Sequence, residues 1–324
     1  MAWPAEGTVK HEPFRLWRDG VTQGLLADFL ECRQKCMYRM MGFEPAGETS
    51  KALVVGSAIH DALEKARRRL RPGAVLSDGE AEGIVSALEV VEAAEGRVTE
   101  HSAYAWTLAW ALLQPYFQFY CVDDRKIEWV ELEGEFCVEQ DVFPYANFCF
   151  RGKFDGVFRS RGSKLWLLET KTRSIVDGEG LSESVGFNHQ VMFYLNALKM
   201  MSGEMPGGVL YDVIKKPALR VKKSETLQEF GCRVRRDATE NPDKYFFRFE
   251  VPVDAGAMAI YRLELRGLLE DFVLWYEEGC WPHYRRTAAC LGKFGRCKYL
   301  RMCDTGSSDG YTRKKQFKYE ELGG

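Results

Sequence analysis

The spacing of apolar residues predicts helices in the first part of the chain. Apolar positions recur at helical intervals from Val21 to Met41, and the same pattern returns after Lys51 until Arg71, Pro72 and Gly73 end it. A later aromatic-rich run keeps this period, although Pro115 is expected to kink it. Helices are expected over 21–41, 51–70, 83–94 and 104–120.

After Arg125 the pattern changes to short, alternating β-rich runs separated by turn residues. Gly162 and Ser163 are expected to form a hairpin turn between a strand that ends near Phe158 and a strand over 164–171. The later pattern predicts a helix over 186–201, strands over 208–214 and 245–253, and a long helix over 255–278. This order predicts one α/β domain around a mixed central sheet flanked by helices.

We expect this single domain to occupy residues 1–304. Its helical N-terminal part spans about 21–121, its core about 125–253, and its C-terminal helix and cysteine cluster 255–304. Residues 305–324 read as a polar tail with little to bury.

Composition and charge exclude several classes of protein. With 324 residues, 46% of them hydrophobic and 28% charged, the chain is expected to pack a sizeable core rather than remain disordered. Its net charge of -2 gives no global basic field, so a nucleic-acid partner requires a local basic patch. No apolar run approaches a membrane span, and no phosphate loop is present. We expect a cytoplasmic protein whose ten cysteines stay reduced.

A carboxylate and lysine constellation carries the main chemical signal. Glu169 and Lys171 are separated by one residue on a predicted strand, so they share a face while Thr170 points the other way. Asp155 lies on the preceding strand, and a hairpin brings it beside Glu169. Such an oxygen-rich site suits magnesium or manganese, and an adjacent lysine suits metal-assisted phosphodiester hydrolysis. The alternative is a surface charge pair, but the apolar run 165–168 makes unpaired charges there costly.

These residues resemble a known family. GKFDGVF followed by LWLLETKTRS is similar to the core of the PD-(D/E)XK nuclease superfamily, in its RecB-like branch. The resemblance implies that Asp155, Glu169, the Thr170 carbonyl and His60 hold the metal, and that Lys171 serves the attacking water.

Two helical motifs extend the resemblance. GSAIH with LE, which ends at Glu64, resembles the family helix whose histidine, here His60, is one more metal ligand. Gln190 and Tyr194 resemble the Q-x-x-x-Y helix that lines the DNA channel. Taken alone, a histidine such as His60 is more often a hydrogen-bonded core residue, and Gln190 with Tyr194 is compatible with an ordinary amphipathic helix.

Cysteines near both ends of the chain form a second constellation. Cys290, Cys297 and Cys303 gather three thiols, and the segment around Cys32 resembles the C-P-x-K-F/Y-x-Y-R helix of RecB-like nucleases that carry an iron-sulfur cluster. The likeness to AddB-type and CRISPR-adaptation nucleases implies a 4Fe-4S cluster on these four cysteines. Arg33 in place of proline and Cys36 in place of an aromatic depart from that pattern.

Alternatives for the cysteines stay open at this point. Cys36 is one helical turn from Cys32 and is a candidate substitute ligand. Four thiolates also suit zinc, although the usual C-x-x-C knuckles are absent. The alternative is that these cysteines are buried small hydrophobes, as is expected of Cys121, Cys137 and Cys149 in the strand-rich region.

Nucleic-acid contacts are expected from local features. Basic clusters occur at 67–69, 215–216, 220–223, 233–236, 285–286 and 313–318, and Tyr211, Phe246 and Tyr284 are candidates for base stacking. The sequence favours a metal-dependent DNA exonuclease for single strands or ends in recombination, repair or phage DNA processing. The alternatives are a non-catalytic iron-sulfur DNA-binding or assembly subunit and an RNA-directed nuclease.

Overall fold

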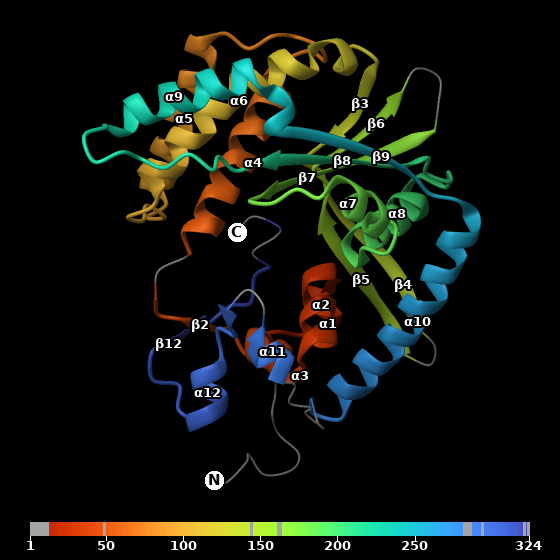
Figure 1. Cartoon of the computed structure of the whole chain (residues 1–324). Helices are drawn as coiled ribbons and strands as arrows, with labels where there is room; N and C mark the ends of the chain where they lie inside the picture. Colours follow the sequence, from red (N-terminus) through yellow and green to blue (C-terminus); the bar gives the residue numbers. More distant parts are fainter. Residues whose placement is uncertain are drawn as a thin grey trace.

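A five-stranded mixed sheet forms the centre of the fold (Figure 1). The structure, a computed structural model, describes residues 13–47, 50–142, 145–160, 164–280, 287–292, 295–319 and 322. The strand order is β3 (Ile127–Leu132), β6 (Gly156–Ser160), β7 (Leu165–Arg173), β8 (Gly208–Lys215) and β9 (Phe246–Pro252). Only β7 and β8 run parallel, so the sheet is mixed, as the sequence predicts. The expected hairpin turn at Gly162 and Ser163 lies outside the described residues.

A helical layer covers one face of this sheet (Figure 1). It contains α4 (Lys51–Arg69), α5 (Asp78–Ala94), α6 (Ser102–Asp124) and α9 (Leu227–Glu240). Ile214 and Phe246 are the sheet residues that pack into the core of this layer. Helix α9 was not predicted from the sequence, although Thr226 and Glu229 form a capping box at its start. The predicted α6 continues through Pro115 without ending.

The opposite face is covered by a second group of elements that share one core. The helices are α1 (Leu16–Asp19), α2 (Gln23–Glu31), α3 (Arg33–Met40), α7 (Gly178–Val185), α8 (His189–Ser202) and α10 (Ala255–Glu277). A second sheet, in the order β1 (Val21–Thr22), β5 (Tyr145–Lys153) and β4 (Glu135–Val142), lies beside them. The buried central-sheet residues that enter this core are Val157, Leu165, Leu167, Val209, Tyr211 and Val213. The two faces of the central sheet therefore carry separate cores.

The prediction of one helix from Val21 to Met41 is wrong at two places. The segment begins as a short strand, and Cys32 has extended dihedral angles (φ -162°, ψ 113°) that separate α2 from α3. Cys32 is therefore a junction residue rather than a position within a helix. As a result, Cys32 and Cys36 do not share the face of one continuous helix.

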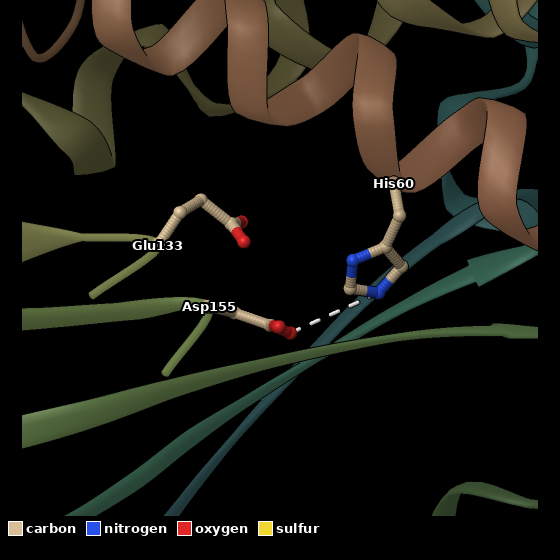
Figure 2. Close-up of side chains that lie close together, drawn as sticks. All are labelled: His60, Glu133 and Asp155. Carbon is tan, nitrogen blue, oxygen red and sulfur yellow. Dashed lines mark ion pairs between the residues drawn. The ribbon is translucent and has the colours of Figure 1, made fainter. Parts of the chain in front are cut away.

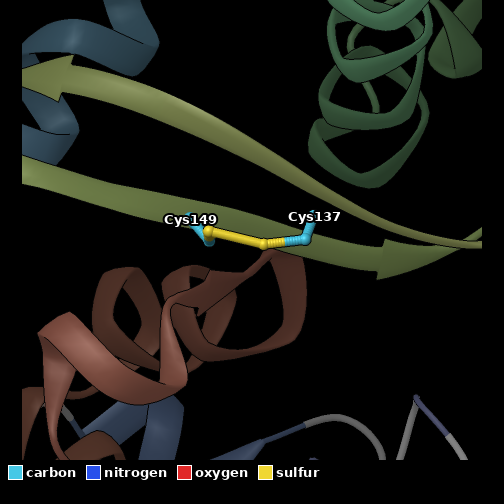
Figure 3. Close-up of a disulfide and its surroundings, with 2 residues drawn as sticks. All are labelled: Cys137 and Cys149. Carbon is cyan, nitrogen blue, oxygen red and sulfur yellow. A yellow bond between two sulfur atoms is a disulfide. The ribbon is translucent and has the colours of Figure 1, made fainter.

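Two cysteines form a disulfide, contrary to the expectation that all ten are reduced. Cys137 on β4 and Cys149 on β5 are joined across the hairpin, with a Cα–Cα distance of 5.5 Å (Figure 3). The reading of these two residues as buried small hydrophobes is also wrong, because neither is buried. In the described part of the chain, the other eight cysteines form no disulfide.

The last part of the chain packs against its beginning. It contains α11 (Thr287–Cys290), β10 (Leu291–Gly292), β11 (Gly295–Arg296), α12 (Leu300–Thr305) and β12 (Tyr311–Arg313), and β12 pairs antiparallel with β2 (Phe43–Pro45). Phe317 and Tyr319 are buried in the core, and the Tyr319 hydroxyl donates to the Gly20 carbonyl at 2.7 Å. The expectation of a tail with little to bury is therefore wrong. A 3-10 turn, η1 (Pro242–Lys244), precedes β9. Among the described residues, no helix has the length and apolar character that crossing a membrane requires.

Candidate metal centre

The site is centred where strands β6 and β7 stop pairing. The two strands pair up to the register Gly156↔Leu168, and β7 continues for five residues beyond it. Asp155, the residue before β6, therefore lies beside Glu169, as the sequence predicts. The Thr170 amide donates a hydrogen bond to Asp155 Oδ2 at 2.6 Å, which fixes the carboxylate at this opening.

Helix α4 brings His60 to the same point. The helix packs close to β7 at Gly56, where an added Cβ would lie 3.1 Å from Thr172 Oγ1. His60 Nε2 lies 2.7 Å from the Thr170 carbonyl oxygen and 3.8 Å from Asp155 Oδ2. Because a carbonyl oxygen can only accept, Nε2 carries the proton in this bond. A metal ion bound by Nε2 would replace that proton.

Glu133, which the sequence analysis did not select, completes a cluster with His60 and Asp155. One ligand atom from each of the three residues lies within 4.8 Å of the others, and Figure 2 shows all three side chains pointing to a common space. Glu133 has a positive φ of 51°, which is uncommon for a residue with a side chain and occurs often at functional sites. Its backbone N–H donates to the Asp155 carbonyl at 3.4 Å. The only hint in the sequence was that Glu133 and Gly134 suit a turn, and nothing in the sequence marks Glu133 as a metal ligand.

Burial and a neighbouring carboxylate perturb Glu133. Its side chain forms an ion pair with Lys153 at 2.9 Å, and Lys153 also lies 3.4 Å from Glu64. Burial, reinforced by the charge of Asp155, nevertheless raises the pKa of Glu133 to about 7. Close carboxylates that are costly to ionise together are stabilised when a cation binds between them.

Lys171 and Gln190 form the other side of the site. Lys171 Nζ lies 2.5 Å from Glu169 Oε1 and donates to Gln190 Oε1 at 2.9 Å. Burial alone would lower the pKa of Lys171, but the negative charges of Glu169 and Asp155 outweigh it and the pKa is raised. The strand alternation is as predicted, since the Thr170 side chain points instead toward α4.

The donor set fits a hard divalent cation. Glu169 Oε2 is buried and has no hydrogen-bond partner within the described ranges, and burial raises the pKa of this carboxyl group. Such an orphaned oxygen is costly unless a cation contacts it. Carboxylate oxygens, a backbone carbonyl and one imidazole are the ligands that magnesium and, with the imidazole, manganese accept.

The family model for the PD-(D/E)XK nuclease superfamily matches residues 21–304, which include every residue of this site. The chain belongs to the PD-(D/E)XK nuclease superfamily. Membership implies a nucleic-acid substrate and a divalent metal ion. None of the curated proteins matches the nuclease.

Two solved structures are distantly similar to the nuclease. A "Putative exonuclease" from Eubacterium rectale is 14% identical, with a TM-score of 0.44, and the match covers 100% of this chain and 98% of the other. SSO0001 is also 14% identical, with a TM-score of 0.30, and the match covers 77% of this chain and 93% of the other. These likenesses are too distant to transfer a function.

Several residues predicted to face nucleic acid are buried in the nuclease. Tyr194 packs edge-on against Phe136 and Phe154, so it supports the wall beneath Gln190 rather than presenting a surface. Tyr211 and Phe246 are also buried, so the prediction that either residue stacks on a base is wrong. The third candidate, Tyr284, and the basic pair 285–286 lie outside the described residues.

Some of the basic clusters are also occupied within the fold. Arg67 points inward and pairs with Asp212 at 2.9 Å, whereas Arg68 pairs with Glu64 on the helix surface. Arg233 pairs with Glu225 at 2.7 Å. Clusters of basic residues in the sequence are therefore poor guides to phosphate contacts here.

The four cysteines predicted as cluster ligands influence one another's titration. Burial, then the neighbouring thiols of Cys297, Cys32 and Cys290, raise the pKa of Cys303 to about 11. Burial also raises the pKa of Cys297, with smaller contributions from Cys32 and Cys290. Among the described residues, these sulfurs do not form a group at the spacing of ligands to one metal ion. Their role as cluster ligands stays a prediction.

Cys36 belongs to a different environment. It is fully buried, its thiol donates to the Leu25 carbonyl at 3.7 Å, and burial raises its pKa well above the ordinary value. The neighbouring groups that raise its pKa further are Asp28, Cys280 and Cys32. The geometry therefore favours Cys32 over Cys36 as the partner of that trio.

The raised pKa of Glu133 predicts a pH dependence of stability in the metal-free nuclease. A carboxyl group whose pKa rises from 4.5 to about 7 on folding stabilises the folded state below pH 4.5, and this contribution is lost as the pH rises through 7. The stability of Glu133→Gln relative to wild type should therefore increase from pH 5 to pH 8. The expected change in the difference of unfolding free energy is on the order of 2 kcal/mol, with a matching rise in relative melting temperature. Thermal melts in EDTA measure this.

The matched control is Glu135→Gln, which changes an exposed carboxylate two residues away. Its melting temperature should follow that of wild type at both pH values. If Glu133→Gln behaved as this control does, the carboxyl group would not be perturbed as described.

Proposed function

We propose that this nuclease is a metal-dependent DNA exonuclease that hydrolyses phosphodiester bonds in single strands or at DNA ends. Its role would lie in recombination, repair or phage DNA processing. The observation that carries the proposal is the unpartnered, buried Glu169 Oε2 beside Asp155, His60 and the Lys171 ammonium group. A carboxylate site with an adjacent cation is what phosphodiester hydrolysis with an activated water requires.

Five groups of this chain would hold Mg²⁺ or Mn²⁺. They are the side chains of His60, Glu133, Asp155 and Glu169 and the carbonyl of Thr170. When bound, the ion supplies Lewis acidity at the phosphate and lowers the pKa of a bound water molecule.

Lys171 would act as a fixed cation rather than as a general base. Its raised pKa keeps the ammonium group protonated at neutral pH, and Glu169 and Gln190 hold its position. A protonated amine at this place orients the attacking water and stabilises negative charge that develops on the phosphate. Gln190 would therefore be a positioning residue that acts through Lys171.

Arg173 offers a contact for a neighbouring phosphate. It lies two residues after Lys171 on the same face of β7. Its Nη2 donates to the Tyr211 hydroxyl at 3.0 Å, while its buried Nε has no partner in the described part of the chain. The remaining donors of a planar guanidinium group are suited to a phosphate oxygen.

Two exposed apolar side chains near this face in sequence favour single-stranded DNA as the substrate. Ile175 follows β7 and is 82% exposed, and Phe187 precedes the start of α8 and is 91% exposed. Gln190, which contacts Lys171, is only three residues from Phe187. An exposed aromatic ring next to a nuclease site can stack on an unpaired base, with about 1–3 kcal/mol per base.

The nuclease assay that tests this proposal uses the full chain with labelled single-stranded DNA, double-stranded DNA and RNA in Mn²⁺ or Mg²⁺. Wild type should degrade DNA from an end, and Lys171→Ala should lose at least about 100-fold in rate, because it removes a charge that acts on the reacting phosphate. Lys244→Ala, an exposed lysine on η1, is the control and should keep full activity. Phe187→Ala should lower activity on single strands more than on duplex.

Each alternative has its own outcome in this assay. Activity that persists in Lys171→Ala would contradict the proposed site, and preferential degradation of RNA would identify an RNA-directed nuclease. Binding of DNA without cleavage in either metal would support a non-catalytic subunit instead.

We further infer that Cys32, Cys290, Cys297 and Cys303 hold a 4Fe-4S cluster. The support is their mutual proximity, together with the pairing of β2 and β12, which brings the two ends of the chain to one place. When bound, a cluster ligated by one cysteine before the core and three after it would cross-link the fold. Cys32 lies at a helix junction, so its extended backbone frees its thiol from the helix face that Cys36 occupies.

Anaerobic purification tests the cluster. Wild type should show broad visible absorption with iron and inorganic sulfide, and Cys303→Ser should lose most of it because a thiolate ligand is removed. Cys36→Ala should keep the absorption, whereas Cys32→Ser should not. Zinc without iron on metal analysis, or equal loss in the Cys36 and Cys32 variants, would contradict this assignment.

A further inference from the structure

A row of buried polar side chains lies next to the metal centre, on the face of the central sheet that α4 and α6 cover. Thr170, Asp212 and Arg248 are register partners on β7, β8 and β9. Paired residues on neighbouring strands project to the same face, so these three side chains form a continuous line. Their side chains meet α4 and α6 rather than solvent.

Arg67 on α4 joins this row. Its Nη1 donates to Thr170 Oγ1 at 3.2 Å, and its Nη2 donates to Asp212 Oδ2 at 2.9 Å and to the Tyr116 hydroxyl at 2.8 Å. Arg67 is 5% exposed and Asp212 is fully buried. This guanidinium group therefore connects two helices and two strands at one point.

The charges of the network balance. Arg248 contacts Asp124 Oδ1 at 2.5 Å and Asp212 Oδ1 at 3.4 Å, so two arginines face two aspartates. The Tyr116 hydroxyl donates to Asp212 and accepts from both arginines. A buried ion network that is fully paired is strongly destabilised when one member is removed, so it holds its members in one arrangement.

The network reaches the metal centre through Thr170 and α4. The main chain of Thr170 contacts Asp155 and His60, while its side chain accepts from Arg67. Arg67 lies seven residues after His60, which is about two helical turns along the same face of α4. The helix is thus attached to Thr170 at two points.

We propose that Arg67 is a positioning residue of the metal centre, which sets the place of the Thr170 carbonyl and of His60 relative to Asp155. The inference rests on the proposed function, since it presumes a cation at this site. Groups that orient metal ligands typically change metal affinity by about 10–100-fold when they are altered. Lysine cannot replace arginine here, because a single ammonium group cannot make the three divergent bonds of the guanidinium group.

The test is calorimetric titration of the full chain with MnCl₂, with melting temperatures in EDTA as a separate record of stability. Arg67→Lys, which keeps the charge, should raise the dissociation constant for Mn²⁺ by about 10–100-fold. Thr170→Val, which removes only the acceptor, should shift affinity in the same direction even if Arg67→Lys fails to fold. The double variant should bind Mn²⁺ little more weakly than the weaker single variant, because both substitutions remove the same hydrogen bond between Arg67 and Thr170.

Arg235→Lys is the matched control. Arg235 is a half-buried arginine of the same helical layer that bonds Gln114 at 2.9 Å and stacks on Trp110, with no bond to β7. This variant should lose stability but keep the wild-type affinity for Mn²⁺. Wild-type affinity in both Arg67→Lys and Thr170→Val would overturn the inference, whereas failure of wild type to bind Mn²⁺ would overturn the proposed function.

Discussion

The register between β6 and β7 is the constraint on which the site depends. The two strands separate after Gly156 and Leu168, so Asp155 leaves the sheet while β7 carries Glu169, Thr170 and Lys171 onward. The opening exposes a backbone amide and a carbonyl of Thr170 that a continued strand would have paired. Those two groups bind Asp155 and His60 instead. A one-residue slip would turn Glu169 and Lys171 to the face of α4.

The polar side chains on the two faces of β7 differ in how completely they are hydrogen-bonded. On the α8 face, Glu169, Lys171 and Gln190 contact one another, and one buried oxygen of Glu169 has no partner among the described residues. On the α4 face, a fully paired network holds Thr170 and leaves no comparable vacancy among its own members. An unpartnered carboxylate oxygen on one face suits a site for a cation. A fully hydrogen-bonded network on the other face holds the residues of that site in place.

The alternating strand pattern made the central part of this fold predictable. Strand periodicity placed Glu169 and Lys171 on one face and Thr170 on the other, and the hairpin placed Asp155 beside Glu169. Glu133 escaped prediction because its role comes from a left-handed turn and a long-range approach to His60. The inward direction of Arg67 was equally invisible, since its partners lie 49 to 145 residues away in sequence. Local pattern thus predicts strand faces, whereas tertiary packing decides which charges are buried.

Manganese anomalous diffraction from crystals of the full chain would locate the cation. We expect a peak at the β6 and β7 opening, within about 2.0–2.3 Å of oxygen atoms of Asp155, Glu169 and the Thr170 carbonyl. His60 should then have exchanged its hydrogen bond to Thr170 for the ion. Absence of a peak there at saturating manganese, with the Glu169 oxygen still unpartnered, would contradict this expectation.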